Sequence, residues 1–105
     1  MNKEFGEALT SIEKPLTKGF IRLSILLILE KTSQYGYRIY KVIKDRLYDK
    51  LSLSTFYTIL RELEEYRIVK RIGDKYVLTE NGLEILGYVK KKYREIAVFL
   101  EKHLA

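Results

Sequence analysis

The chain has 105 residues with a formal net charge of +6, enough for one compact domain and favourable for polyanionic partners, nucleic acid or an anionic membrane surface. Cysteine is absent, which excludes a disulfide framework and a thiolate metal site. The apolar run at residues 25–29 is too short to span a bilayer, and the N-terminus lacks the apolar region of an export signal. We therefore expect a cytoplasmic protein without a membrane segment.

The first two predicted helices are separated by Pro15. Residues 2–14 form a short amphipathic helix, which is not stable alone and must lie on its own domain or on a partner subunit. Its apolar face comprises Phe5, Leu9 and Ile12. Residues 17–31, capped by Thr17, are apolar almost all round and predict a buried helix. The isoleucines there would also suit a strand, but the length and the lack of alternation favour a helix.

Residues 33–47 predict the next helix. Gly36 lies in its first turn, where it would allow close approach to the preceding helix. The inward side of this helix comprises Gly36, Tyr40, Ile43 and Leu47, flanked by Tyr37 and Ile39. Residues 48–51 then form a turn into a further helix at residues 51–67, so the two helices have a helix-turn-helix arrangement.

The helix at residues 51–67 has a start signal and two different faces. Ser52 can cap it, and Ser54 is the alternative cap. The core-facing stripe comprises Phe56, Ile59, Leu60 and Leu63. The opposite face is short and polar, and comprises Ser54, Thr58 and Arg61, with Thr55 and Tyr57 at its edges. Such a face suits entry into a DNA major groove; a merely solvated face is the alternative.

Two short β-prone runs follow, at residues 68–72 and 75–78. Gly73 and Asp74 separate them, which is a hairpin signal of the II′ type. Tyr76 and Leu78 point to one face. The exposed positions include the cations Lys70, Arg71 and Lys75. A helix-turn-helix followed by a basic hairpin is the winged-helix order, and the wing would contact phosphates or the minor groove. A hairpin that only covers the core edge is the alternative.

The last predicted helix begins after the cap Thr79 and runs to about His103. A seam of apolar residues is spaced three, four, three, four, which is the a/d pattern of a helix–helix interface. It comprises Leu86, Val89, Tyr93, Ile96 and Leu100. A second copy of the same helix is the simplest cover and would give a two-fold dimer. Packing of this seam on the chain's own N-terminal helix is the alternative. If the N-terminal helix crosses to the partner subunit, the seam can contact both the partner's C-terminal helix and an N-terminal helix.

Three segments in this order resemble the PadR-like family of winged-helix transcriptional regulators. They are LSILLILEKTSQYGYRIYKVIKDRL, LSLSTFYTILRELEEYRIVKR and YVLTENGLEIL, within residues 19–86. The resemblance implies a dimeric regulator with its third helix in the major groove, the wing alongside and the C-terminal helix in the dimer, as in the small branch of the family. Some members respond to small molecules. The chain departs from the pattern at Leu53 and Ser54, where Pro-Gly is common, and at Arg67, where glycine is usual.

The sequence thus predicts an α+β, mostly α fold: a winged helix-turn-helix with an N-terminal helix and a long C-terminal dimerisation helix. We divide the chain into residues 1–15 (the N-terminal amphipathic helix), 16–78 (the DNA-binding domain) and 79–105 (the dimerisation helix).

The expected function is that of a regulator, a repressor in the simplest case, which binds double-stranded DNA as a homodimer on a pseudo-palindromic operator. Additional backbone contacts are predicted at Arg22, Arg38 and Lys41. No cofactor, metal site or catalytic residue is predicted, because the chain has one histidine, His103, and no nucleophile or phosphate-loop motif. The alternatives are a protein–protein interaction module and a non-specific architectural DNA binder. A small-molecule effector has no support in the residues.

Overall fold

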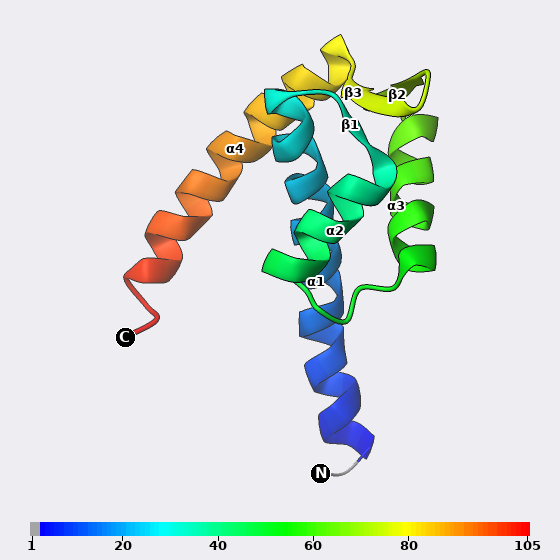
Figure 1. The fold of residues 1–105 in the computed structure, drawn as a ribbon. Coiled ribbons are helices and arrows are strands. Elements are labelled where there is room, and N and C mark those ends of the chain that lie inside the picture. The colour runs from blue at the N-terminus through cyan, green and yellow to red at the C-terminus, as the bar shows by residue number, and fades with distance from the viewer. Residues whose placement is uncertain (1–2) are drawn as a thin grey trace.

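The computed structural model describes residues 3–105, which form four helices and a three-stranded antiparallel sheet (Figure 1). The elements are α1 (Lys3–Lys31), β1 (Gln34–Tyr35), α2 (Gly36–Arg46), α3 (Leu53–Glu65), β2 (Val69–Ile72), β3 (Lys75–Leu78) and α4 (Glu80–Glu101). Helices α2 and α3 form the helix-turn-helix pair, and β2 and β3 form the wing. The predicted α+β, mostly helical architecture is confirmed.

The predicted helix break at Pro15 is wrong, because α1 is a single helix of 29 residues that contains this proline. Proline lacks the N–H that would bond to the carbonyl of Ser11, one turn earlier. Both residues are exposed, so water can hydrate that carbonyl and the helix continues. The two predicted N-terminal helices are therefore one element about 44 Å long.

The predicted helix at residues 33–47 begins with a short strand instead. Gln34 pairs with Tyr76 and Tyr35 with Lys75, so β1 forms an edge of the sheet beside β3. Gly36 is also tightly packed, but not against α1 as expected. A Cβ on Gly36 would lie 3.1 Å from the Tyr57 ring and 3.2 Å from the Tyr76 ring. The glycine thus lets α2 start directly against α3 and the wing.

The core lies where α1, α2, α3 and the sheet meet. The four stripe residues predicted for α3 are all buried, which confirms that face. The other buried apolar residues are Ile21, Ile25, Leu26, Leu29, Ile39, Tyr40, Ile43, Leu51, Val69, Tyr76 and Leu86. The buried Tyr40 hydroxyl donates a hydrogen bond to the Leu51 carbonyl over 3.0 Å, which ties α2 to the turn before α3. Leu47, expected on the inward side of α2, is instead half exposed.

Both ends of α3 have specific caps. The Ser52 hydroxyl accepts a hydrogen bond from the Thr55 amide, so Ser52 and not Ser54 is the cap. At the other end, the Arg67 amide donates to the Glu64 carbonyl and the Ile68 amide to the Leu63 carbonyl. These two bonds form a Schellman motif, which needs a left-handed residue after the helix. Arg67 adopts that conformation with φ of 60°, at the position where the family resemblance implies glycine.

Helices α1 and α4 form a V that opens toward the two chain termini (Figure 1). They meet along the C-terminal half of α1, where the Lys90 ammonium contacts the Glu30 carboxylate at 2.7 Å and the Phe20 ring packs edge-on to Tyr93. The radius of gyration is 15.3 Å, compared with about 13 Å for a compact domain of this length. The arms of the V account for the excess, since they extend beyond the core.

Candidate nucleic-acid interface

Four of the five residues predicted to contact bases lie on the outward face of α3. Ser54, Thr55, Thr58 and Arg61 are all exposed along it. The stripe on the opposite side of the helix is buried, and so this face is directed away from the core. The structure therefore brings four of the five predicted recognition residues together on one open surface.

The hydroxyl groups on this face differ in what they can still offer a ligand. Thr58 donates its hydroxyl proton to the Ser54 carbonyl over 3.0 Å, so it has only acceptor lone pairs and its methyl group left. Thr55 accepts a hydrogen bond from the Ser52 hydroxyl over 2.9 Å, so it can still donate. Thr58 thus suits a base donor or a thymine methyl, and Thr55 suits a base or phosphate acceptor.

Tyr57, the fifth predicted residue, is placed differently. It is only partly exposed, and its ring packs edge-on against Phe56 with centroids 5.3 Å apart. It also lies directly over the start of α2 at Gly36. Its main visible role is to pack α3 against α2. Arg61, by contrast, makes no ion pair among residues 3–105 and is available to a phosphate or a base.

The wing is a two-residue hairpin in which Lys70 pairs with Val77 and Arg71 with Tyr76. Gly73 has φ of +62°, and Arg67 is the one non-glycine residue of positive φ between residues 3 and 105. A positive φ at the first central residue alone agrees with the predicted II′ turn. Because side chains alternate along a strand, Lys70 and Lys75 lie on the outer face of the wing. Arg71 lies on the other face, beside Tyr76.

Two aromatic rings support the wing cations. The Lys75 ammonium lies 5.2 Å from the centroid of the Tyr35 ring, and the Arg71 guanidinium lies 5.8 Å from that of Tyr76. Both distances are within the range of a cation–π contact. Burial raises the pKa of Tyr76 above its ordinary value, and the nearby Glu64 carboxylate adds to the effect. Tyr76 therefore stays neutral and serves as an apolar support for Arg71.

The three additional backbone contacts predicted from the sequence have different surroundings. Arg38 is exposed and has no ion pair within residues 3–105, whereas Lys41 pairs with Asp45 at 3.4 Å on the same helix. Arg22 donates to the Glu62 carboxylate over 2.6 Å. A phosphate would therefore compete with Glu62 for the Arg22 guanidinium, so Arg22 is the least accessible of the three.

The predicted seam on α4 needs one correction. Leu86 is fully buried in the core of its own chain, so it has no surface left for a partner. Val89 is partly exposed, and Tyr93, Ile96 and Leu100 retain more than two-fifths of their surface. The available seam thus begins one turn later than expected, because Leu86 packs into the core of its own chain.

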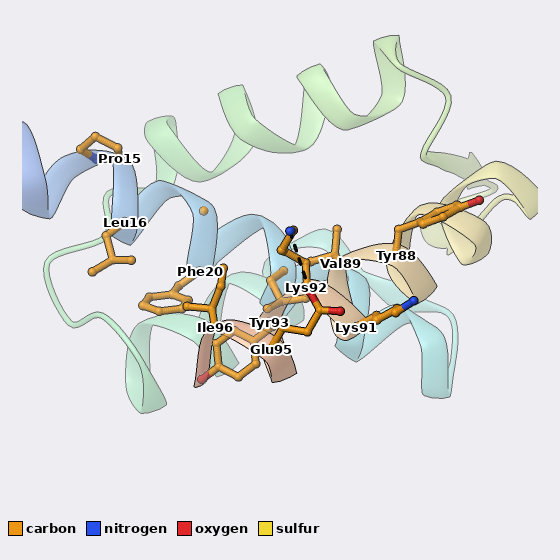
Figure 2. Close-up of a pocket in the computed structure, with 12 residues that line it drawn as sticks. Pro15, Leu16, Phe20, Tyr88, Val89, Lys91, Lys92, Tyr93, Glu95 and Ile96 are labelled. Carbon is orange, nitrogen blue, oxygen red and sulfur yellow. Dashed lines mark ion pairs between the residues drawn. The ribbon is translucent and has the colours of Figure 1, made fainter. Parts of the chain in front are cut away.

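A largely apolar hollow of about 620 Å³ lies between the arms of the V. Figure 2 shows Leu16 and Phe20 of α1 facing Val89, Tyr93 and Ile96 of α4 across it. Leu9 and Ile12, which lie closer to the N-terminus of α1, are also exposed. Seam residues of α4 and apolar residues of α1 therefore border the same concave surface.

Two contacts near α3 and the wing are not apparent from the sequence. Local sequence patterns give no sign of Glu62, which pairs with Arg22, and they predict a helix at Tyr35, which instead lies in β1 under Lys75. Arg22 and Glu62 are 40 residues apart, and no local spacing relates them. Only the strand preference of an aromatic residue before a glycine could have indicated that Tyr35 lies in a strand.

Comparisons with known proteins point to regulators of transcription. No protein-family model and no curated protein matches the chain significantly. Among solved structures, it resembles a PadR family transcription regulator from Clostridium difficile R20291, with a TM-score of 0.71 and 29% identity over 82% of this chain and 99% of that one. It also resembles smu.1704 from Streptococcus mutans UA159, with a TM-score of 0.66 and 29% identity over 77% and 82% of the two chains.

A transcriptional regulator from Clostridium thermocellum has the same fold, with a TM-score of 0.73 and 22% identity over 90% of this chain and 99% of that one. Within residues 3–105, no helix is both long and apolar enough to cross a membrane. The helix-turn-helix pair, the wing and these likenesses together show that the chain has the PadR-like winged-helix fold.

Proposed function

We propose that the protein is a sequence-specific transcription regulator that binds double-stranded DNA as a homodimer. The observation that carries this proposal is the outward face of α3, which presents short polar side chains and Arg61 away from a buried stripe. A helix of this kind can enter a major groove and contact base edges. The likeness to a PadR family transcription regulator supports the same conclusion.

The interface divides into base contacts and backbone contacts. Ser54, Thr55 and Thr58 would read bases, with Arg61 on a base or a phosphate. Lys70 and Lys75 would bind phosphates or the minor groove from the outer face of the wing, and Arg71 would add its charge from the other face. The first group would determine specificity, whereas the cations would supply affinity that depends on salt.

The dimer would form through the arms of the V. The exposed apolar residues on α1 and α4 make up a surface of the kind that marks protein interfaces. Such a dimer would have two copies of α3 related by a two-fold axis. Recognition helices about 34 Å apart would read half-sites one DNA turn apart, and hence a pseudo-palindrome. Repression by occupying the operator is the simplest regulatory outcome, because it needs no further protein contact.

The decisive experiment is selection of duplexes from a random pool with the purified protein at about 150 mM salt. We expect an enriched inverted repeat with half-sites one helical turn apart. Binding without an enriched motif, with a steep loss of affinity as salt rises, would identify a non-specific architectural binder instead. No binding even at low salt would favour a protein–protein interaction module.

Sedimentation velocity tests the dimer separately. The protein should sediment as a dimer, and Ile96→Glu should yield a folded monomer, because a charge in an apolar interface is not solvated there. Leu83→Glu, a change of the same chemistry at an exposed position outside the seam, is the control and should remain dimeric. A monomeric wild-type protein would contradict the dimer.

A further inference from the structure

A second hollow, of about 500 Å³, lies between the middle of α1 and the turn that leads into α3. Lys14 and Lys18 line it from α1, and Lys50 lines it from the turn. All three lysines are exposed. We refer to these three residues as the lysine patch. It brings Lys50 next to two lysines that lie more than 30 positions earlier in the sequence.

The charge of the lysine patch is not neutralised by the protein. None of the three lysines forms an ion pair with a carboxylate in residues 3–105. Glu13 is the one acidic residue that lines the hollow, so the surface keeps a net positive charge. By contrast, Lys41 and Lys90 each pair with a carboxylate. The patch is therefore a concentrated site of attraction for an anion.

The patch is continuous with the outward face of α3. The same hollow is lined by Ser52, which caps α3, and by Thr55, which belongs to the recognition face. The wing begins just beyond the other end of α3, at Val69. Helix α3 has 13 residues and is about 20 Å long. Exposed cations thus lie at both ends of this helix, the patch at its start and the wing at its end.

We propose that the lysine patch binds the DNA backbone on the side of α3 opposite to the wing. This inference rests on the proposed function, and it adds an anchoring surface that includes α1. A helix seated in the major groove has a phosphate backbone on either side, so cations at both its ends can contact phosphates at once. The hydroxyls of Thr10 and Thr17, which line the same hollow, can donate to phosphate oxygens as well. A lysine that contacts a phosphate acts as a point charge, and phosphate contacts fix position without reading the bases, so the patch contributes affinity and position but no sequence preference.

The salt dependence of DNA binding tests this inference. The probe is a random-sequence duplex of about 30 base pairs, and the variant is Lys14→Gln/Lys18→Gln/Lys50→Gln. The slope of log K against log salt should become shallower by roughly 0.9 for each phosphate that a lysine no longer neutralises. The control variant, Lys3→Gln/Lys31→Gln/Lys102→Gln, removes the same charge from exposed positions that line neither hollow. Its slope should stay close to that of the wild type.

A second measurement locates the phosphates that the patch binds. Phosphate-ethylation interference on the selected duplex should show that the patch variant loses a set of phosphates on one side of each half-site. Lys75→Gln should lose phosphates on the other side. Equal slopes for the patch and control variants, or interference patterns identical to wild type, would overturn the inference while leaving the proposed function intact. A wild-type protein without salt-dependent DNA binding would overturn the proposed function itself.

Discussion

The Arg22 guanidinium donates to the Glu62 carboxylate over 2.6 Å and so joins α1 to α3, the helix whose outer face would read DNA. Arg22 also donates to the Lys18 carbonyl of its own helix, at 3.3 Å. The guanidinium is therefore held from two sides. This link fixes α1 relative to α3.

We expect a measurable coupling between these two residues. In a double-mutant cycle of Arg22→Ala and Glu62→Ala, the interaction should contribute about 0.5–1 kcal/mol to the free energy of unfolding, because both side chains are partly exposed. The matched control is the pair Lys92 and Glu95, 3.9 Å apart and more exposed, for which the cycle should give a value near zero. Equal values for the two pairs would contradict a specific role for Arg22. Chemical denaturation measures these free energies of unfolding.

Two glycines of α4 should respond oppositely to alanine. A Cβ on Gly82 would overlap the carbonyl oxygen of Ile68, which accepts the Thr79 amide at 3.1 Å. Gly82→Ala should therefore lower the free energy of unfolding by about 2–3 kcal/mol, as overpacking does. A Cβ on Gly87 meets no atom within 4 Å, and Gly87→Ala should raise the stability by about 0.5–1 kcal/mol. A tolerated Gly82→Ala would show that the junction of wing and α4 is looser than the structure indicates.

The left-handed residue after α3 offers a stabilising substitution. Arg67 has φ of 60°, a conformation that costs a non-glycine residue about 1–2 kcal/mol. Arg67→Gly removes this cost but gives the unfolded chain more freedom, worth about 0.4–1 kcal/mol. We expect the melting temperature to stay the same or rise. Arg61→Gly within α3 is the control and should lower stability by about 1 kcal/mol. A similar loss at both positions would argue against the left-handed conformation.

Alkaline pH should destabilise the protein through Tyr76. Burial raises the pKa of Tyr76 in the folded state above 10.0, its ordinary value, so the folded chain keeps this proton when the unfolded chain releases it. The associated stability is fully present below pH 10 and is lost as the pH rises toward the folded pKa. Tyr76→Phe should reduce the loss of stability between pH 9 and pH 11, measured by urea unfolding. Tyr88→Phe, at an exposed position, should leave the pH dependence unchanged.

Specificity and affinity should separate on mutation. Thr58→Ala removes an acceptor and a methyl group from the recognition face, so discrimination between the selected duplex and a random duplex should fall by about 1 kcal/mol. Lys75→Ala should weaken binding to both duplexes alike and make the salt slope shallower by about 0.9. Fluorescence anisotropy titrations at several salt concentrations measure both effects. Identical behaviour of the two variants would contradict the division into base and backbone contacts.

Local patterns in the sequence predicted the elements closest to the recognition surface. The stripe of α3, the Ser52 cap and the two-residue turn at Gly73 depend on spacings of a few residues, and each is present in the structure. The Thr79 cap of α4 is likewise formed, since its hydroxyl accepts from the Gly82 amide. These features could be read because their partners lie within one or two turns of the chain.

Features that depend on distant partners could not be predicted in this way. Gln34 and Tyr35 form a strand because β3, 40 or more residues later, offers its free edge. Leu86 has the spacing of an interface residue, but the fold of the same chain buries it first. Pro15 has a strong local preference to end a helix, and yet the exposed surroundings allow the helix to continue. In each case tertiary packing or solvent overrides the local signal.

In the proposed dimer, the proline inside α1 would also bear on how far apart the two DNA half-sites can lie. Where proline replaces an N–H, a helix can bend without breaking a hydrogen bond, and sharp kinks concentrate at such positions. Pro15 separates the buried part of α1, from Ile21 onward, from the arm that carries Leu9 and Ile12. Bending at this point would change the angle between two paired subunits but leave each recognition helix intact. The two copies of α3, each unchanged, could then bind operators whose half-sites are separated by slightly different numbers of base pairs.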